Sequence, residues 1–228
     1  MSNIVFKNKN LIIAYKPAGV PSQSDKSGDD DIMSIISSEL KNQGEDGTLY
    51  PVHRLDRVVG GLIVFARNHS YAGALSSLVS DDTFGKEYVA VVEGVAQGGE
   101  MRDYLHKDAM IGKSIVVNKG TAGAKEAVLN YKVLGTGLFS GKPLSFVKIK
   151  LNTGRFHQIR SQFASRGMPL IGDVKYGSKI RKSKTPALFS YKMDFEINGE
   201  RFSATKMPDF SDFPWNIFSE TTCYDSEN

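Results

Sequence analysis

The chain has 228 residues, of which 40% are apolar and 24% charged, and a formal net charge of +4. This composition is typical of a globular protein with a hydrophobic core, and no apolar run approaches the length that a membrane-spanning helix needs. The first ten residues lack the pattern of a secretory signal, and the single cysteine, Cys223, can form neither an internal disulfide nor a multi-cysteine zinc site. We therefore expect a cytoplasmic protein.

The first half of the chain alternates predicted strands and helices. Strands are predicted at 11–15 and at 61–67, each as a short apolar run. A helix is predicted at 32–40, where apolar residues recur at helical spacing after a run of capping aspartates, and another at 70–81. A β-rich run follows at 86–93.

The second half is richer in strands. Residues 126–134 and 144–151 alternate apolar and polar side chains, as half-buried strands do. Residues 187–205 predict a hairpin whose turn is Asn198-Gly199. Because most strands are joined by hairpins and a few helices lie between them, we predict an α+β fold with a mixed, mainly antiparallel sheet flanked by helices.

The charge is unevenly distributed along the chain. Residues 23–50 and residues 207–228 each carry a net charge of −5, so the remainder carries +14. Two interpretations fit this basic remainder: it is an ordinary solvated surface, or it binds a polyanion.

Motifs for cofactors and metals are absent from the sequence. There is no G-x-G-x-x-G, H-E-x-x-H or G-x-S-x-G, and the four histidines lack the spacing of metal ligands. Residues 111–114 (IGKS) end like a phosphate-binding loop but lack its first glycine, so we interpret them as a hairpin turn. We expect no cofactor, no metal and, because no linker divides the chain, a single domain over residues 1–228.

The stretch PVHRLDRVVGG, at 51–61, places a carboxylate between two arginines just before an apolar strand. In an extended chain Arg54 and Asp56 lie on the same side and can face one cleft. Gly60 and Gly61 tolerate the dihedral angles of a sharp turn. Asp56 is then either a turn or ion-pair residue, which is the commoner role of Asp in such places, or a catalytic carboxylate.

The stretch NTGRFHQIR, at 152–160, ends a strand and begins a helix predicted over 157–167. Ile159 and Phe163 face the core, which leaves Arg160 to lie along the edge of the helix. The helix dipole disfavours an arginine near the helix start. Arg160 is therefore either a surface residue or the partner of a carboxylate or anionic ligand.

Two further features have two interpretations each. A basic run follows PLIGDVKYG and is either a solvated face or a phosphate-binding surface; it consists of Lys175, Lys179, Arg181, Lys182 and Lys184. Tyr88, in KEYVAVVEG, is either a sheet residue or a ring on which a nucleobase stacks.

Taken together and in this order, these stretches resemble the RluA family of pseudouridine synthases. HRLD resembles the family's H-R-L-D-x-x-T-S-G, KEYVAVVEG its K-x-Y-x-A-x-V-x-G, and TGRFHQIR its T-G-R-T-H-Q-I-R. PLIGDVKYG resembles P-I-x-G-D-x-x-Y-G, and the early KPAGVPSQ resembles the family's K-P-a-G opening. The resemblance covers residues 11–195.

The resemblance implies a pseudouridine synthase catalytic fold with a central active-site cleft, in which uridines of ribosomal or transfer RNA are isomerised to pseudouridine without a cofactor. It implies that Asp56 is the catalytic carboxylate, that Arg160 keeps it ionised, and that Tyr88 stacks on the flipped uracil. The expected substrate-binding residues are Arg54, Ile171, His53, Arg155, His157 and, from its charge, Lys175. We expect a monomer that binds RNA, no membrane association, and no separate N-terminal RNA-binding domain.

The sequence departs from the family motifs at four positions. Val59 and Gly60 stand in place of Thr-Ser, Phe156 in place of Thr, and Gln162 in place of a usual His. One alternative is therefore a non-catalytic RNA-binding or ribosome-assembly protein on the same fold. Another is a globular protein in which Asp56 and Arg160 form a purely structural pair.

Overall fold

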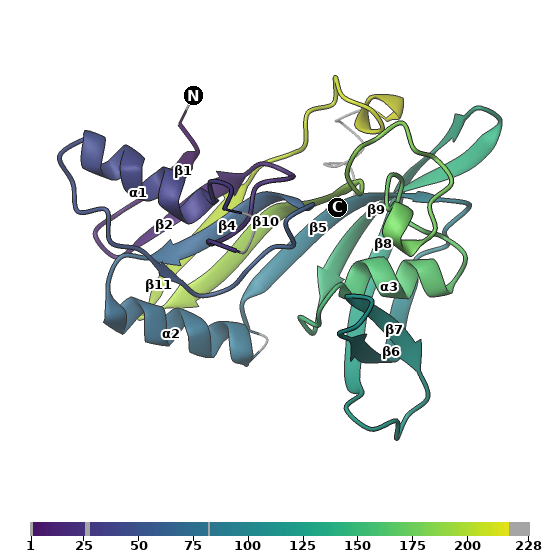
Figure 1. Cartoon of the computed structure of the whole chain (residues 1–228), viewed down its shortest axis with the longest axis horizontal. Coiled ribbons are helices and arrows are strands. Elements are labelled where there is room, and N and C mark those ends of the chain that lie inside the picture. Colours follow the sequence, from purple (N-terminus) through teal and green to yellow (C-terminus); the bar gives the residue numbers. More distant parts are fainter. Residues whose placement is uncertain (1, 26–27, 82, 219–228) are drawn as a thin grey trace. The chain divides into compact units, whose positions relative to one another are not determined.

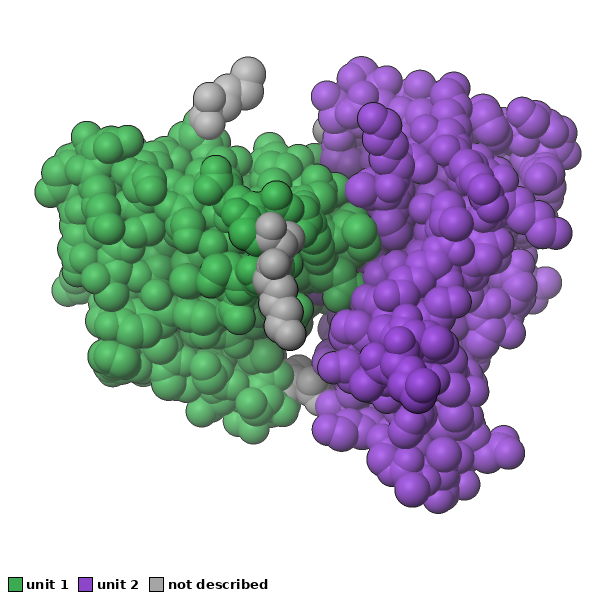
Figure 2. Space-filling view, in the orientation of Figure 1, with its two compact units in different colours: residues 1–86, 190–207 green, residues 87–189, 208–228 purple. Residues whose placement is uncertain are grey.

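The chain forms two compact units in the computed structural model, which describes residues 2–25, 28–81 and 83–218 (Figure 1). Unit 1 comprises residues 1–86 and 190–207, and unit 2 comprises residues 87–189 and 208–228; Figure 2 colours them separately. Cys223 lies outside the described residues. That residues 1–228 act as one catalytic domain stays a prediction.

Unit 1 contains a sheet with the strand order β1-β2-β4-β10, to which β3 adds on β4 and β11 adds on β10. The pairs β1–β2, β2–β4, β3–β4 and β10–β11 are antiparallel. The strands are β1 (Ile4–Lys7), β2 (Leu11–Lys16), β3 (Tyr50–Pro51), β4 (Gly60–Ala66), β10 (Leu188–Ile197) and β11 (Glu200–Thr205).

Two helices complete unit 1, and its strands run between them in Figure 1. The helix α1 (Ile32–Asn42) begins where the Asp31 carboxylate accepts a hydrogen bond from the backbone N–H of Ser34, as the aspartate run predicts. The helix α2 (His69–Ser80) is capped in the same way by Asn68. Leu75 of α2 packs into a core cluster with β2 and β4.

Unit 2 is built on an antiparallel sheet with the strand order β5-β9-β8-β6-β7. Its strands are β5 (Gly85–Glu93), β6 (Gly99–Asp108), β7 (Lys113–Val117), β8 (Lys125–Phe139) and β9 (Lys142–Leu151). The helix α3 (Gln158–Ser165) packs on one face, where the Phe163 and Tyr131 rings meet edge to face at 5.1 Å. Two 3-10 helices follow, η1 (Val174–Tyr176) and η2 (Trp215–Ile217).

The predicted α+β class with a mainly antiparallel sheet is confirmed. The predicted hairpin turn at Asn198-Gly199 is also found, because both residues have positive φ (53° and 79°) and the flanking Ile197 and Glu200 are paired. Residues 111–114 lie at the turn of the β6–β7 hairpin, as interpreted from the sequence. The strands β1, β3, β6 and β7 were not predicted. Polar side chains on both faces of β6 and β7 mask their alternation.

Candidate active site

Asp56 begins a tight turn in unit 1. Its backbone C=O accepts a hydrogen bond from the N–H of Val59 at 2.9 Å, and β4 starts at the next residue. Asp56 therefore lies at a turn, with its half-buried side chain just before a buried strand. That Asp56 is the catalytic carboxylate stays a prediction. Gly61 needs to be glycine because its φ is +122° and a Cβ there would lie 2.3 Å from the backbone oxygen of Ser190.

The KPAGVPSQ loop is hydrogen-bonded to the Asp56 turn, once between backbone groups and three times between a side chain and the backbone. The N–H of Gly19 donates to the C=O of Arg57 at 2.8 Å, and Nε of Arg57 donates back to the C=O of Gly19 at 2.9 Å. The Ser22 hydroxyl donates to the C=O of Leu55 at 2.8 Å and accepts from its N–H at 3.1 Å. Two motifs more than thirty residues apart thus form one rigid support on both sides of Asp56.

Lys16 is the residue of this support that sequence reasoning missed. Its side chain is fully buried, and Nζ donates to the C=O groups of Val20 (2.7 Å), Arg57 (3.1 Å) and Pro17 (3.2 Å). Burial lowers the pKa of Lys16 to about 8, while the Asp56 carboxylate acts in the opposite direction. Lys16 is therefore positively charged at neutral pH and contributes a positive potential at Asp56. The signal in the sequence was a lysine that ends an otherwise apolar strand.

The other polar residues of the segment have different surroundings. Nε2 of His53 accepts a hydrogen bond from the N–H of Val64 at 3.2 Å, so its neutral ring carries the proton on Nδ1. Burial, helped by the nearby Lys86 charge, lowers the pKa of His53 to about 3. Arg57 pairs with Asp29, and Arg54 is exposed. That His53 and Arg54 bind substrate stays a prediction.

Arg160 in unit 2 is buried rather than placed along the edge of its helix, which corrects the prediction. Its side chain donates from Nε to Oδ2 of Asp173 at 2.7 Å and from an Nη to Oδ1 at 2.8 Å, and only 4% of the residue is exposed. Asp173 supplies the carboxylate that the dipole argument called for. Asp173 was missed, although it is the only acid within PLIGDVKYG.

Tyr176 connects Arg160 with its neighbours. The Arg160 guanidinium lies 5.0 Å from the centre of the Tyr176 ring. The Tyr176 hydroxyl accepts from the N–H of Ser114 at 2.7 Å and lies 2.9 Å from Nδ1 of His157. Burial and the nearby Arg160 charge lower the pKa of His157 to about 3, so this ring is neutral at physiological pH. His157 caps α3 with a left-handed φ of 51°.

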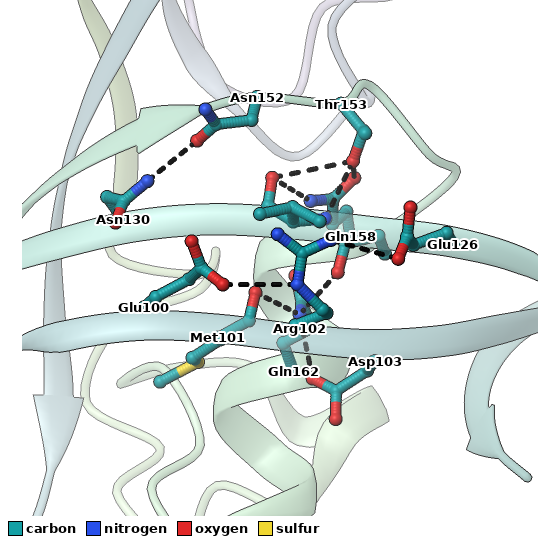
Figure 3. A network of polar contacts seen from close by, with 12 residues as sticks. Glu100, Met101, Arg102, Asp103, Glu126, Asn130, Asn152, Thr153, Gln158 and Gln162 are labelled. Carbon is teal, nitrogen blue, oxygen red and sulfur yellow. Dashed lines mark hydrogen bonds and ion pairs between the residues drawn. The ribbon is translucent and has the colours of Figure 1, made fainter.

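Two glutamines fix α3 to the sheet of unit 2, in the polar network of Figure 3. Gln158 accepts from the Thr153 hydroxyl and from the N–H of Arg155, and donates to the C=O of Val128. One turn further, the Gln162 amide donates to the Asp103 carboxylate at 2.7 Å. Thr153 and Gln158 thus fold the TGRFHQIR motif back on β8, which fixes where Arg160 points.

The basic run at 175–184 begins in η1 and continues into a loop that Glu93 anchors. Oε1 of Glu93 accepts from the Ser178 hydroxyl at 2.6 Å and from the N–H groups of Lys179 (2.9 Å) and Ile180 (3.2 Å). All five basic side chains of the run, from Lys175 to Lys184, are exposed. The loop therefore presents exposed basic side chains on a backbone that Glu93 anchors.

The predicted site residues fall in both units. Asp56, Arg54 and His53 belong to unit 1, and the rest belong to unit 2. The structure brings Arg160 and His157 together through Tyr176; Tyr88 and Ile171 are buried in unit 2, while Arg155 and Lys175 are exposed.

Among the described residues there is no group of three or more His, Cys, Asp or Glu side chains that could hold a metal ion, and no helix long and apolar enough to span a membrane.

Comparison with known proteins identifies a family. A family model described as RNA pseudouridylate synthase matches residues 10–165. The chain is 28% identical over 209 residues to ribosomal large subunit pseudouridine synthase D of Borreliella burgdorferi, covering 87% of this chain and 62% of that protein. It is 31% identical over 183 residues to tRNA pseudouridine synthase C of Haemophilus ducreyi, covering 77% and 74% respectively. The chain spans less than two thirds of the length of the first of these relatives.

A solved structure has a similar fold. Human RNA pseudouridylate synthase domain containing 1 superposes with a TM-score of 0.76 at 21% identity, over 91% of this chain and 83% of that one. The likeness confirms the predicted fold.

Proposed function

The chain belongs to the RNA pseudouridylate synthase family, and from this premise we propose that it isomerises uridines in RNA to pseudouridine, with Asp56 as the catalytic carboxylate. The observation that carries the proposal is the family match over residues 10–165, which includes Asp56, Tyr88 and Arg160. In this reaction the bond from the ribose to N1 of uracil breaks, the base turns, and the ribose is joined to C5, which loses its proton while N1 gains one. No oxidant, reductant or energy source is consumed.

In the proposed mechanism Asp56 acts in its ionised form, as a nucleophile or as a base. The positive charge of buried Lys16 favours the carboxylate, and the Lys16 contacts with the 55–59 turn restrict its movement. Arg160 serves the same reaction as a guanidinium whose orientation is fixed by Asp173 and Tyr176. Tyr88 supplies the ring that stacks on the uracil.

The target base has to leave its stack before it can react, so the protein must hold the surrounding RNA open. We assign this task to Arg54, Arg155, His157 and Lys175, with Ile171 on the apolar side of the pocket and His53 beside the catalytic turn. The exposed basic side chains of the anchored 175–184 run support phosphate binding. Neutral His157 contributes hydrogen bonding rather than charge.

We infer the class of substrate RNA from the names of the relatives. Two of them are named for modifying the large ribosomal subunit RNA and tRNA. We propose that this chain modifies one of these RNA classes, acts as a monomer in the cytoplasm, and needs no metal.

The experiment that tests this function maps pseudouridine in the total RNA of a strain in which the gene is deleted. We expect at least one pseudouridine to disappear, to return when the wild-type gene is restored, and to stay absent with Asp56→Asn. Asp30→Asn is the matched control, since Asp30 is an exposed acid of the same unit.

A deletion strain with an unchanged pseudouridine map would refute the proposal. If the purified protein then bound RNA in a salt-sensitive way, the non-catalytic RNA-binding alternative would be the correct one. Full activity of Asp56→Asn would refute the assignment of Asp56 while leaving the family function in place.

A further inference from the structure

Phe156 forms an aromatic stack at the start of α3. Its ring lies face to face with that of His157, with centroids 3.8 Å apart and an interplanar angle of 19°. The ring is half-buried, and the Lys107 ammonium lies 4.8 Å from its centre. Because His157 covers one face, the other face is the one on which a further planar group can stack.

Lysines of the β6–β7 hairpin surround this stack. Lys107 of β6 lies over Phe156, and Lys113 of β7 lies 5.8 Å from the centre of the Tyr176 ring. Nζ of Lys175 lies near the hairpin turn, 3.2 Å from the position that a Cβ would occupy at Gly112. Lys175 and Lys107 also contribute to the low pKa of His157, after burial and Arg160. Three lysines therefore lie near the Phe156, His157 and Tyr176 rings.

The hairpin is held in a defined position beside α3 (Figure 1). The backbone C=O of Ser114 in β7 accepts from the Ser161 hydroxyl of α3 at 2.9 Å, and the Ser114 N–H donates to Tyr176. At the tip, Oδ1 of Asp108 accepts from the N–H groups of Met110 (2.9 Å) and Ile111 (3.2 Å). The tip is thus ordered, although Met110 is 98% exposed and Ile111 is 53% exposed.

We propose that Phe156 and the β6–β7 hairpin form an RNA-contacting surface, on which one unpaired base stacks on Phe156 while Lys107 and Lys113 bind the adjoining phosphates. A positive surface interleaved with aromatic rings is what single-stranded nucleic acid requires. The incoming base takes the place of the Lys107 ammonium on the ring, and that ammonium moves to a phosphate. The exposed Met110 and Ile111 then cover the next nucleotide. The inference rests on the proposed function, because it assumes an RNA substrate.

Phe156 is also a position at which this chain departs from the family motif, which has Thr there. Threonine offers no ring on which a base can stack. The surface is therefore expected to determine which RNA this chain selects, rather than the chemistry at Asp56.

The test measures binding by fluorescence anisotropy with the full chain and two labelled RNAs: a hairpin with an unpaired, uridine-containing loop, and a blunt duplex of matched length. Phe156→Thr is expected to weaken binding of the loop RNA roughly tenfold, with the salt dependence unchanged, and to leave duplex binding unaltered. Lys107→Gln with Lys113→Gln is expected to lower the slope of log affinity against log salt by about 1.4 for the loop RNA.

Lys132→Gln with Lys150→Gln is the matched control. These two lysines are exposed on the sheet of the same unit. Their double substitution removes the same charge as that of Lys107 and Lys113. The proposal would be overturned if Phe156→Thr bound the loop RNA as tightly as the wild type does. It would also be overturned if the control pair lowered the salt slope as much as Lys107→Gln with Lys113→Gln. If Phe156→Thr lowers the melting temperature, Phe156→Leu, which keeps an apolar side chain against His157, is measured in its place and judged by the same criterion. A protein that forms no pseudouridine but shows these binding differences would refute the proposed function and keep this surface.

Discussion

Replacing Lys16 by Met tests whether a buried ammonium supports the turn of Asp56. Methionine has a similar length, fills the same space and removes both the charge and the donors. The C=O of Val20 then loses its 2.7 Å donor, while the C=O of Arg57 keeps the N–H of Gly19 and the C=O of Pro17 keeps the N–H of Val20. An unpaired buried carbonyl costs about 1–3 kcal/mol.

The opposing effect is that Lys16→Met no longer buries a charged ammonium, which stabilises the folded chain. Burial lowers the pKa of Lys16 from 10.5 to about 8, which corresponds to roughly 3 kcal/mol of destabilisation wherever the group is charged in both states. At pH 7 the two effects nearly cancel, and we expect the free energy of unfolding of Lys16→Met to lie within about 2 kcal/mol of the wild-type value.

The pH dependence distinguishes the two effects. Between pH 8 and pH 10.5 the unfolded chain still holds the Lys16 proton while the folded chain has lost it, so the stability of the wild type rises with pH. Methionine cannot titrate. The stability of the wild type relative to Lys16→Met should therefore increase by roughly 3 kcal/mol between pH 7 and pH 10.5 or above.

Urea denaturation of both proteins at the two pH values gives this difference, in which the titration of all other groups cancels. Lys9→Met, at an exposed lysine of the same unit, is the control and should show no such change. A difference between wild type and Lys16→Met that stays constant with pH would refute the reasoning.

Two further predictions each concern an ionisable group of one unit. Asp173→Asn should lower the free energy of unfolding by about 3 kcal/mol, because it removes the charge that two buried donors of Arg160 contact. Urea denaturation measures this loss, and a value below about 1 kcal/mol would contradict the prediction. His53 has a folded-state pKa near 3, so below pH 6.5 only the unfolded chain takes up its proton, and stability falls. From pH 7 to pH 5 the wild type should lose about 2 kcal/mol more than His53→Gln, and equal losses would contradict the pKa.

The local elements of the fold were predictable because their signals lie within a few residues. Asp31 and Asn68 begin their helices by accepting from an N–H three residues later, and the Asn198-Gly199 turn needs positive φ at two adjacent positions. The inward positions of Ile159 and Phe163 follow from the helical repeat alone, and both are buried. The strands β6 and β7 were not predicted because they lack a continuous apolar face and are defined by their pairing with each other.

The sequence motifs predicted which residues belong to the candidate site, but not which side chains surround them. The sequence placed Arg160 on a helix that begins near residue 157, and the helix dipole indicated that it needs an anionic partner. Which carboxylate fills that role depends on Asp173, thirteen residues further on, folding back through η1. From the sequence, Phe156 was only a departure from a family motif. Its contacts with His157 and Lys107 require β6 to lie beside the start of α3.

By itself, the sequence determined the family motifs, the helix starts, the hairpin turn and the identity of Asp56 as the candidate carboxylate, because each depends on side-chain type and short-range spacing. Only the tertiary structure decided that Lys16 is buried beneath the Asp56 turn and that Arg160 is enclosed rather than exposed. A charged side chain can be buried only where distant backbone carbonyls or carboxylates meet it, and Lys16 finds such a partner in Arg57, forty-one positions away. Those partners exist only once the chain has folded.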